Sequence, residues 1–494
     1  MYLRLFVEFL YSIQHSKFII QRSLLYFSAV ITSDTIVALA TAPGVGAIGV
    51  IRLSGPQAIE IAGSAFKGKD LSKQKSHTIH YGHIVDDDKI LDEVMVSLFK
   101  APKSFTTEDV VEISCHGSPF VAEQIIRLLI QKGARSAKPG EFTLRAFMHG
   151  RIDLSQAEAV ADLIASSSSA SQQLALQQMR GGFSNQIKDL RTQLLNFASL
   201  IELELDFSEE DVEFANRGQL LDLIDRIQQL LQPLAESFKL GNVIKNGVNT
   251  VIAGKPNAGK STLLNALLNE ERAIVSEIPG TTRDTIEEVM NINGIQFRFI
   301  DTAGIRITTD AIEQQGVERT MEKLRQSAVY IYLFDVNKTT PQELLQELKE
   351  LELLGFSGLI VGNKVDKANW KTTAPFYNAI EFTRGKHHFP EIMFVSANTH
   401  YNLPLLKEKL YQLVTSSAKI GTQDTIITNL RHYEALVKAN EALTLVRTGI
   451  ENQNTGELVA FDIKRALEYL GEISGEVTND EILGNIFSKF CIGK

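Results

Sequence analysis

Residues Gly254-Lys-Pro-Asn-Ala-Gly-Lys-Ser261 indicate the fold of the central part of this chain. This stretch matches G-x-x-x-x-G-K-[ST], and it lies between a strand-like run at 248–253 and a helix-like run that begins at Thr262. A glycine-rich loop in this position points successive main-chain N–H groups at phosphates. Lys260 then supplies a charge to the β- and γ-phosphates, and the Ser261 hydroxyl is the expected Mg²⁺ ligand. The phosphate-binding residues predicted here are Asn257, Ala258, Gly259, Lys260, Ser261 and Thr262.

The residues that read the base come later in the chain. Asn363-Lys364-Val-Asp366 closes a strand-like run at 359–362. The Asp366 carboxylate can accept hydrogen bonds from the ring N–H and the exocyclic amino group of guanine, a donor pair that adenine lacks. Ser396-Ala397-Asn398 also follows a strand-like run and can present a main-chain N–H to the guanine oxygen. N-K-x-D is a weak signal alone, but its order after the phosphate loop makes GTP the expected nucleotide.

Two further segments complete the predicted GTP site. Asp301-Thr302-Ala303-Gly304 ends a strand-like run, so Asp301 is expected to hold Mg²⁺ through water and the Gly304 N–H to meet the γ-phosphate. Thr282 is a candidate second Mg²⁺ ligand. The switch segment around it consists of Ser276, Glu277, Ile278, Pro279, Gly280, Thr281 and Thr282.

One residue of the usual hydrolytic machinery is missing from its place. Many GTPases carry a glutamine directly after D-x-x-G to orient the attacking water, and this chain has Ile305 there. A partner protein or another group of this chain must therefore orient the water and offset the charge of the transition state.

Composition and charge limit the remaining possibilities. The chain has 494 residues, so about two to four domains are expected. Its net charge of −9 argues against a generally basic nucleic-acid coat, although local basic patches remain compatible with it. Only two cysteines occur, which excludes a disulfide framework and favours a reducing, cytoplasmic compartment. No run is long and apolar enough to predict a membrane span.

The order of strand-like and helix-like segments predicts a multidomain fold of α+β and α/β type. Five apolar strand-like runs, mostly separated by helix-like segments, predict a mainly parallel sheet around the phosphate loop; they lie at 248–253, 297–300, 329–335, 359–362 and 392–395. Residues 1–33 are expected to be an extension of no function, a poorly formed targeting peptide or a packed terminal helix. The other expected parts are an α+β domain at 34–150, an all-helical domain split between 151–246 and 416–494, and the inserted P-loop domain at 247–415. The helical domain is expected to start with a capping-box variant at Asp153 and Gln156 and to be interrupted at Gly181-Gly182.

Several independent segments resemble the MnmE (also TrmE) family of tRNA-modification GTPases. The resemblance covers about residues 34–494. Besides the GTPase motifs, it rests on four segments: Ala47-Ile-Gly-Val-Ile-Arg-Leu-Ser-Gly55, Lys138-Pro-Gly-Glu-Phe142, Arg145-Ala-Phe147 and Cys491-Ile-Gly-Lys494. A ribosome-assembly or translation GTPase is the alternative, but it has no reason to carry Lys138–Phe142 or the Cys491–Lys494 ending. A folate-dependent aminomethyl transferase that the GTPase domain only regulates is a third interpretation.

The resemblance implies a GTPase that needs potassium. Its potassium ligands would be Asn257, Ser276, Ile278 and Thr281, although position 276 is commonly threonine in the family. The ion would supply the positive charge that other GTPases receive from an arginine finger. The water-orienting acid of the family falls on Glu313, which sequence pattern alone would assign to a solvated helix face.

The family also implies a one-carbon site and specific partners. The N-terminal domain resembles folate-binding domains, and a formyl- or methylene-tetrahydrofolate would be held by Arg52, Glu112, Arg151 and Lys494. The implied reaction adds an aminomethyl or carboxymethylaminomethyl group to position 5 of the wobble uridine of certain tRNAs. A homodimer would act with a flavin-bearing partner, MnmG, in a heterotetramer or a larger assembly.

Two weaker signals concern glycine and cysteine. Gly44-Val-Gly46-Ala-Ile-Gly49 matches G-x-G-x-x-G, but the strand-like Val50-Ile-Arg-Leu53 follows where a dinucleotide site needs a helix, so a turn between strands is expected. Cys115 is expected to serve in packing. Cys491 is expected to be either an inert thiol or a reactive thiol of the one-carbon site.

Overall fold

The structure of the chain is a computed structural model that describes residues 34–206, 216–269, 287–300, 329–352, 358–383, 392–415, 426–478, 480–488 and 490–493. The described residues form two compact units, divided between Ala161 and Asp162 and again between Leu470 and Gly471. The first unit therefore combines the N-terminal part of the chain with its last residues. The five-part division expected from the sequence stays a prediction.

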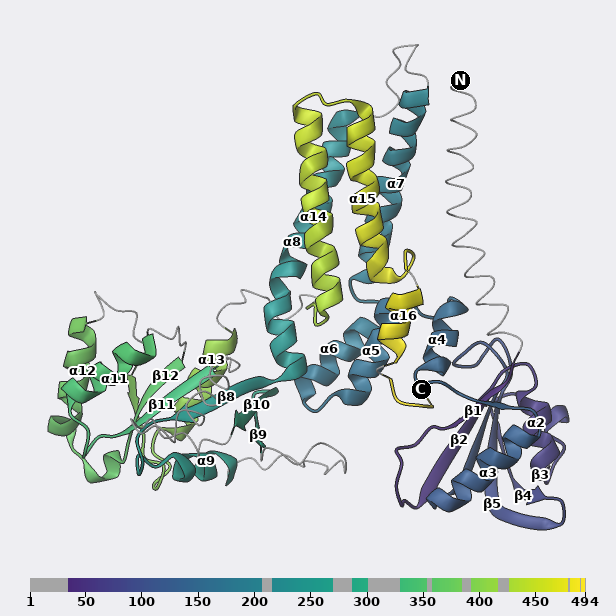
Figure 1. Cartoon of the computed structure of the whole chain (residues 1–494), viewed down its shortest axis with the longest axis horizontal. Coiled ribbons are helices and arrows are strands. Elements are labelled where there is room, and N and C mark those ends of the chain that lie inside the picture. The colour runs from purple at the N-terminus through teal and green to yellow at the C-terminus, as the bar shows by residue number, and fades with distance from the viewer. Residues whose placement is uncertain are drawn as a thin grey trace, which may run out of the picture. The chain divides into compact units, whose positions relative to one another are not determined.

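The first unit is built on a seven-stranded sheet of order β3-β4-β5-β6-β2-β1-β7 (Figure 1). All neighbouring strands are antiparallel except β1 and β7, which are parallel. The strands are β1 (Ile36–Leu39), β2 (Ile48–Ser54), β3 (Phe66–Lys67), β4 (Thr78–Asp86), β5 (Lys89–Phe99), β6 (Val110–His116) and β7 (Arg135–Ser136). Gly49, the last glycine of the G-x-G-x-x-G match, lies inside β2, which confirms that the match leads into a strand rather than a helix.

Helices α2 (Ala58–Ala65) and α3 (Pro119–Gln131) cover one face of this sheet. Alternate residues of β2 and β6, such as Ile51 and Ile113, pack against them, as the period of two in a strand requires. Cys115 belongs to the same core, with 3% of its surface exposed, and burial raises the pKa of its thiol. The prediction that Cys115 serves in packing is therefore confirmed.

The other face of the sheet is covered at its β1 end by α4 (Glu141–Met148), whose Phe142 packs with Ile36 and Ala38. Helices α5 (Leu154–Ala165) and α16 (Asp480–Phe487) add a small core that includes Leu154, Phe487 and Phe490. Asp153 and Gln156 cap α5 reciprocally, at 2.9 and 2.8 Å, which confirms the capping box predicted there.

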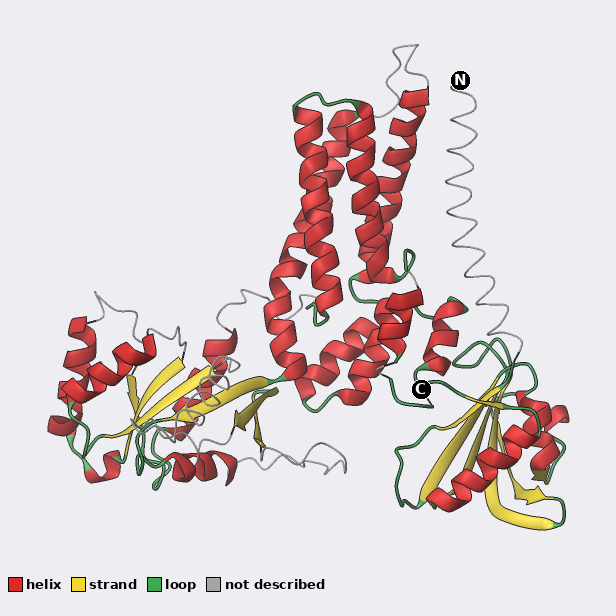
Figure 2. Ribbon diagram, in the orientation of Figure 1, coloured by secondary structure: helices red, strands yellow, loops and turns green. Residues whose placement is uncertain are grey.

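The second unit begins with a group of long helices joined to a second sheet (Figure 2). These helices are α6 (Ser169–Met179), α7 (Ser184–Asp206), α8 (Arg217–Asn246), α14 (Leu430–Glu451) and α15 (Gly456–Ser474), of which α15 ends in the first unit. Helix α8 packs against α7 and α14. The break predicted at Gly181-Gly182 lies between α6 and α7. Gly247, at φ +75°, ends α8 and leads directly into the sheet.

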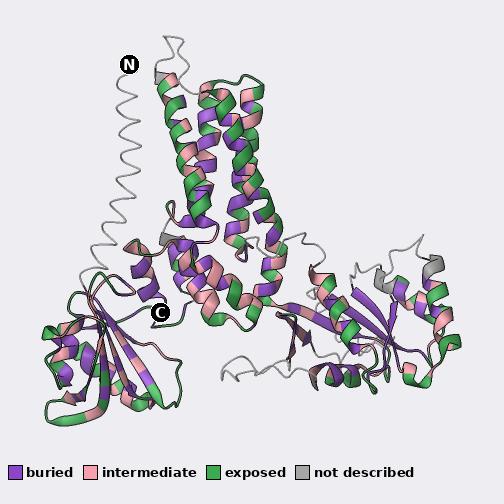
Figure 3. Cartoon of the chain, turned by 180° about the vertical axis from the view of Figure 1, so that it is seen from behind, coloured by how far each residue is buried: buried purple, intermediate pink, exposed green. Residues whose placement is uncertain are grey.

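The second sheet has six strands in the order β13-β12-β11-β8-β10-β9. Its strands are β8 (Val248–Ala253), β9 (Glu287–Ile292), β10 (Ile295–Ile300), β11 (Val329–Asp335), β12 (Gly358–Asn363) and β13 (Ile392–Phe394). All pairs are parallel except β9 with β10. The five strand-like runs recognised in this region are confirmed, and Figure 3 shows the central strands as buried.

Helices cover both faces of this sheet. Helices α9 (Lys260–Asn269) and α13 (Leu403–Thr415) share one core, while α11 (Pro341–Glu352) and α12 (Trp370–Thr383) share the other. Strand β9 was not predicted from the sequence. The signal for it was the Asn293-Gly294 pair, with φ of +50° and +88°, which is the preferred two-residue hairpin turn. Within the described ranges, no helix has the length and apolar character that crossing a membrane requires.

Candidate nucleotide site

The phosphate loop leaves the carboxyl end of β8 and enters α9. Its first and last glycines adopt conformations that side chains rarely tolerate, with φ of +140° at Gly254 and +99° at Gly259. A Cβ on Gly254 would lie 1.9 Å from the Leu333 carbonyl oxygen, and a Cβ on Gly259 would lie 2.4 Å from Nδ2 of Asn363. Both glycines are therefore required for this loop to pass beside β11 and the Asn363 loop.

Lys260 closes over the loop that precedes it. Its ammonium donates to the carbonyl oxygens of Gly254 at 2.7 Å and Lys255 at 3.3 Å. Burial lowers the pKa of Lys260, because partial loss of hydration destabilises the charged ammonium relative to the neutral amine. Ser261 and Thr262 are exposed in the first turn of α9. A helix N-terminus with a half-buried lysine beside it fits an anionic phosphate, which would offset the cost of burying that charge.

Asn363 ties this loop to the two other predicted loops. It is 2% exposed, its Nδ2 donates to the Ala258 carbonyl at 2.9 Å, and its Oδ1 accepts from the Ala397 N–H at 3.1 Å. The three segments meet because β8, β11, β12 and β13 are parallel, so their carboxyl ends lie on one edge of the sheet. Asn363 therefore holds the three loops together through buried hydrogen bonds.

Lys364 makes the second link. Its ammonium donates to the Asn257 carbonyl at 2.6 Å and pairs with the Asp335 carboxylate at 2.9 Å. Burial alone would raise the pKa of Asp335, but the hydrogen bonds from Lys364 and Asn337 outweigh it and lower the pKa. Asp335 and Asn337 were not predicted as residues of this site. Their signal was an acid at the carboxyl end of β11, next to the strand that carries Asn363.

Asp366 is exposed and is oriented from the neighbouring loop. Its Oδ1 accepts from the buried Ser396 hydroxyl at 2.7 Å, and that hydroxyl in turn accepts from the Thr399 N–H at 3.2 Å. Asn398 is exposed beside them. A carboxylate fixed in this way can accept from two adjacent N–H donors, as guanine recognition needs.

The remaining predicted residues of the GTP site lie outside the described residues. These are Ser276, Glu277, Ile278, Pro279, Gly280, Thr281, Thr282, Asp301, Thr302, Ala303, Gly304 and Glu313. Of the predicted metal ligands, Ser261 and Asn257 are described, and both are exposed. Within the described part of the chain, no three His, Cys, Asp or Glu side chains gather as a metal site would require.

The predicted one-carbon residues lie in the first unit. Arg52 and Glu112 are opposite each other on β2 and β6, and Glu112 Oε1 lies 2.8 Å from Nε and 2.7 Å from Nη2 of Arg52. The pair is mostly buried, with 17% and 26% of the two side chains exposed. Nη1 of Arg52 donates to the Gly493 carbonyl at 3.2 Å. The structure thus brings the C-terminal segment to this pair.

Arg151 belongs to the same unit and donates to the Ser104 carbonyl. No contact between Arg151 and the Arg52–Glu112 pair occurs among the hydrogen bonds and ion pairs of the described residues. Lys494 is outside the described residues. Cys491 is exposed.

Two models of known protein families match this chain. The model of the MnmE helical domain matches residues 154–491, which is more than half of the chain, and the model of the GTP-binding protein TrmE N-terminus matches residues 35–151. The chain belongs to the MnmE family.

Curated relatives agree with this assignment over nearly the whole chain. A tRNA modification GTPase MnmE of Cytophaga hutchinsonii is 57% identical over 462 residues, which are 94% of this chain and 98% of that protein. The protein of the same name from Christiangramia forsetii is 54% identical over 472 residues, 94% of this chain and 99% of that protein. The one from Bacteroides fragilis is 51% identical over 469 residues, 93% of this chain and 99% of that protein.

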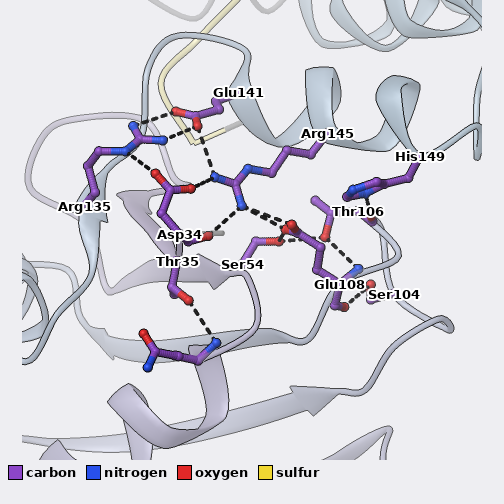
Figure 4. Close-up of polar contacts among 11 residues, drawn as sticks. Asp34, Thr35, Ser54, Ser104, Thr106, Glu108, Arg135, Glu141, Arg145 and His149 are labelled. Carbon is purple, nitrogen blue, oxygen red and sulfur yellow. Dashed lines mark hydrogen bonds and ion pairs between the residues drawn. The ribbon is translucent and has the colours of Figure 1, made fainter. Parts of the chain in front are cut away.

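The structure explains why two segments that mark the MnmE resemblance stand where they do. Glu141 is 5% exposed and accepts from Arg135 at 2.5 Å, from Arg145 at 3.2 Å and from the Lys138 N–H at 2.7 Å. Arg145 is fully buried and also pairs with Asp34 at 2.6 Å and Glu108 at 3.1 Å (Figure 4). These segments build an ionic network at α4 in which Glu141 and Arg145 are buried and the Glu108 side chain is 9% exposed, while the side chains of Arg135 and Asp34 are 41% and 33% exposed.

Proposed function

We propose that this chain is a potassium-dependent GTPase that acts with a flavin-bearing MnmG partner on tRNA. Together they would add a carboxymethylaminomethyl or aminomethyl group to position 5 of the wobble uridine of certain tRNAs. The observation that carries the GTPase part is the joining of the phosphate loop to the predicted guanine loop through Asn363 and Lys364. Membership of the MnmE family supports the tRNA part.

The chain's own residues account for nucleotide binding as follows. The N-terminus of α9 and Lys260 would hold the phosphates, Ser261 would ligate Mg²⁺, and Asp366 would bind the guanine edge. Asn257 fits a potassium ligand, since Lys364 fixes its main chain at φ +64° while its amide side chain stays exposed. Potassium, when bound, would supply positive charge to the transition state. Glu313 would orient the attacking water, because Ile305 cannot.

The first unit would hold the one-carbon donor, a formyl- or methylene-tetrahydrofolate. A carboxylate such as Glu112 can accept from the amino and ring N–H groups of a pterin, and cationic groups suit the carboxylates of its glutamate. The mostly buried Arg52–Glu112 pair next to the C-terminal segment supports this position. Arg151 and Lys494 would complete the site, and Cys491 would be a thiol near it.

The assembly would be a cytoplasmic homodimer joined through its N-terminal domains, with MnmG in a heterotetramer or larger complex. GTP hydrolysis would drive a conformational change that assembles the modification site, rather than supply its chemistry.

The experiment that tests the proposal is nucleoside analysis of tRNA from cells that lack this gene. We expect the modified wobble uridines to disappear and to return when the wild-type gene, but not an Asp366→Ala variant, is supplied. The Asp366→Ala variant should accumulate to the same level as the wild type, which serves as the control. Unchanged wobble uridines in the deletion strain would instead favour a GTPase of ribosome assembly or translation.

A further inference from the structure

The last described residues of the chain form a tail, Phe490–Gly493, that is attached to the first unit at three successive points. Phe490 is buried in the small core with Phe487. The carbonyl of Cys491 accepts from the Gly140 N–H at 3.4 Å. The carbonyl of Gly493 accepts from Arg52 at 3.2 Å. Two of the three attachments use main-chain atoms of the tail, so they leave the exposed Cys491 side chain uninvolved.

Gly493 is the tightest of these points. It is buried, and its φ of +95° lies in the region that favours glycine. A Cβ at this position would lie 2.3 Å from the Leu39 carbonyl oxygen and 2.9 Å from the Cα of Ala40. Both neighbours are main-chain atoms of β1 and the residue after it, so they cannot rotate away. Any other residue at 493 must lift the tail from the sheet.

Gly140 is also tightly packed, at the start of the tail. Its φ is +67°, and a Cβ there would lie 2.7 Å from the Phe487 carbonyl oxygen and 3.0 Å from the Cβ of Phe490. The glycine of the Lys138–Phe142 segment thus lets α16 and the tail pack against the start of α4. Two glycines more than 300 residues apart in sequence numbering therefore bound the same tail.

Arg52 joins the tail to the Glu112 pair. Nε and Nη2 of Arg52 face Glu112, Nη1 faces Gly493, and the guanidinium lies 5.7 Å from the centre of the Phe142 ring. All three nitrogens are thus engaged with the protein. The guanidinium therefore bridges Glu112 and the tail, in addition to any contact it makes with a ligand.

We propose that Gly493 and Gly140 are positioning residues, which dock the tail as one wall of the Arg52–Glu112 site and so determine its affinity for a tetrahydrofolate derivative. This inference rests on the proposed one-carbon site for the identity of the ligand. The docking of the tail itself does not depend on any ligand. The two parts can therefore be tested separately on the full-length chain.

The docking is tested with a nitroxide spin label on Cys491. The sequence has only one other cysteine, the buried Cys115, so labelling is directed to the tail. We expect a restricted label in the wild type and a several-fold shorter rotational correlation time in Gly493→Ala. Gly484→Ala, whose Cβ would have no neighbour within 4 Å, is the matched control and should resemble the wild type. Equal label mobility in Gly493→Ala and the wild type would overturn the docking.

The role in binding is tested by calorimetric titration of the unlabelled proteins with 5-formyltetrahydrofolate. We expect Gly493→Ala to raise the Kd at least tenfold, while the melting temperature and the rate of GTP hydrolysis stay at the wild-type values. Gly493→Asn should not rescue binding, because asparagine tolerates the positive φ but still brings a Cβ against Leu39. An unchanged Kd in Gly493→Ala would overturn the positioning role. If the wild type does not bind the folate, the proposed one-carbon site fails, whereas the spin-label result on the tail stands.

Discussion

Asn363 donates through its side-chain amide to the carbonyl of Ala258 at 2.9 Å, although 105 residues separate them in the chain. The two residues belong to different loops, one expected to bind phosphate and the other guanine. The contact is buried, so it makes the geometry of one loop depend on that of the other. Nucleotide affinity should therefore be sensitive to a side chain that does not need to touch the nucleotide.

Replacing Asn363 by alanine should weaken GTP binding at least tenfold, which corresponds to about 1.4 kcal/mol. The variant leaves the Ala258 carbonyl and the Ala397 N–H without their buried partner. The Kd can be measured with a fluorescent GTP analogue. Asn242→Ala, at an exposed position of α8, is the control and should keep the wild-type Kd. Equal affinities of all three proteins for the GTP analogue would show that Asn363 does not support the geometry of the site.

Replacing potassium by sodium should lower GTP turnover sharply at saturating GTP, because the smaller ion fits poorly in a site of side-chain and carbonyl oxygens. Asn257→Gly removes the proposed amide ligand while it keeps the positive φ accessible. This variant should lose the difference between the two salts. Steady-state phosphate release measures both effects at constant ionic strength. If the wild type turns over GTP equally fast in sodium, the ion-ligand assignment is wrong.

Replacing Glu313 by alanine should abolish GTP turnover and leave the Kd for GTP near the wild-type value. The reason is that a water-orienting group acts on the reaction and not on nucleotide binding. Single-turnover hydrolysis and equilibrium binding separate the two. A loss of binding as large as the loss of turnover would mean that Glu313 has a structural role instead.

Replacing Glu141 by glutamine should destabilise the first unit by about 3–5 kcal/mol at pH 7, because Arg135 and the fully buried Arg145 lose a charged partner. Burial by itself raises the pKa of Glu141, but the hydrogen bond from Arg135 and its other partners lower it on balance below the usual 4.5. The stabilisation by Glu141 is therefore present above pH 4.5 and is lost as the pH falls through the folded-state pKa.

Urea unfolding followed by circular dichroism at several pH values tests this prediction. The difference between the wild type and Glu141→Gln should be largest near neutral pH and should shrink below pH 4.5. Glu123→Gln, at an exposed position of α3, is the control and should match the wild type throughout. A difference that does not change with pH would contradict the assignment of the effect to the Glu141 charge.

Elements that are specified by a few neighbouring residues could be predicted from the sequence, and those that depend on distant residues could not. The phosphate loop, the capping box at Asp153 and the buried strand β11 could be recognised because glycine spacing, a cap and an apolar run each act within a few residues. The hairpin strand β9 was missed because its residues are not uniformly apolar, although the Asn293-Gly294 turn pointed to it. Asp335 was not predicted because its role depends on its ion pair with Lys364, which lies on another loop of the chain.

The order of residues along the chain specifies which chemical groups the site contains and in which order they follow the strands, because main-chain conformation and strand periodicity are set over a few residues. Which of these groups meet depends instead on the tertiary fold. The parallel order of the second sheet brings Asn363 to Ala258, and the packing of Phe490 brings Gly493 to Arg52, 441 residues away. Such contacts depend on how whole elements pack their apolar faces, which no local pattern of residues specifies.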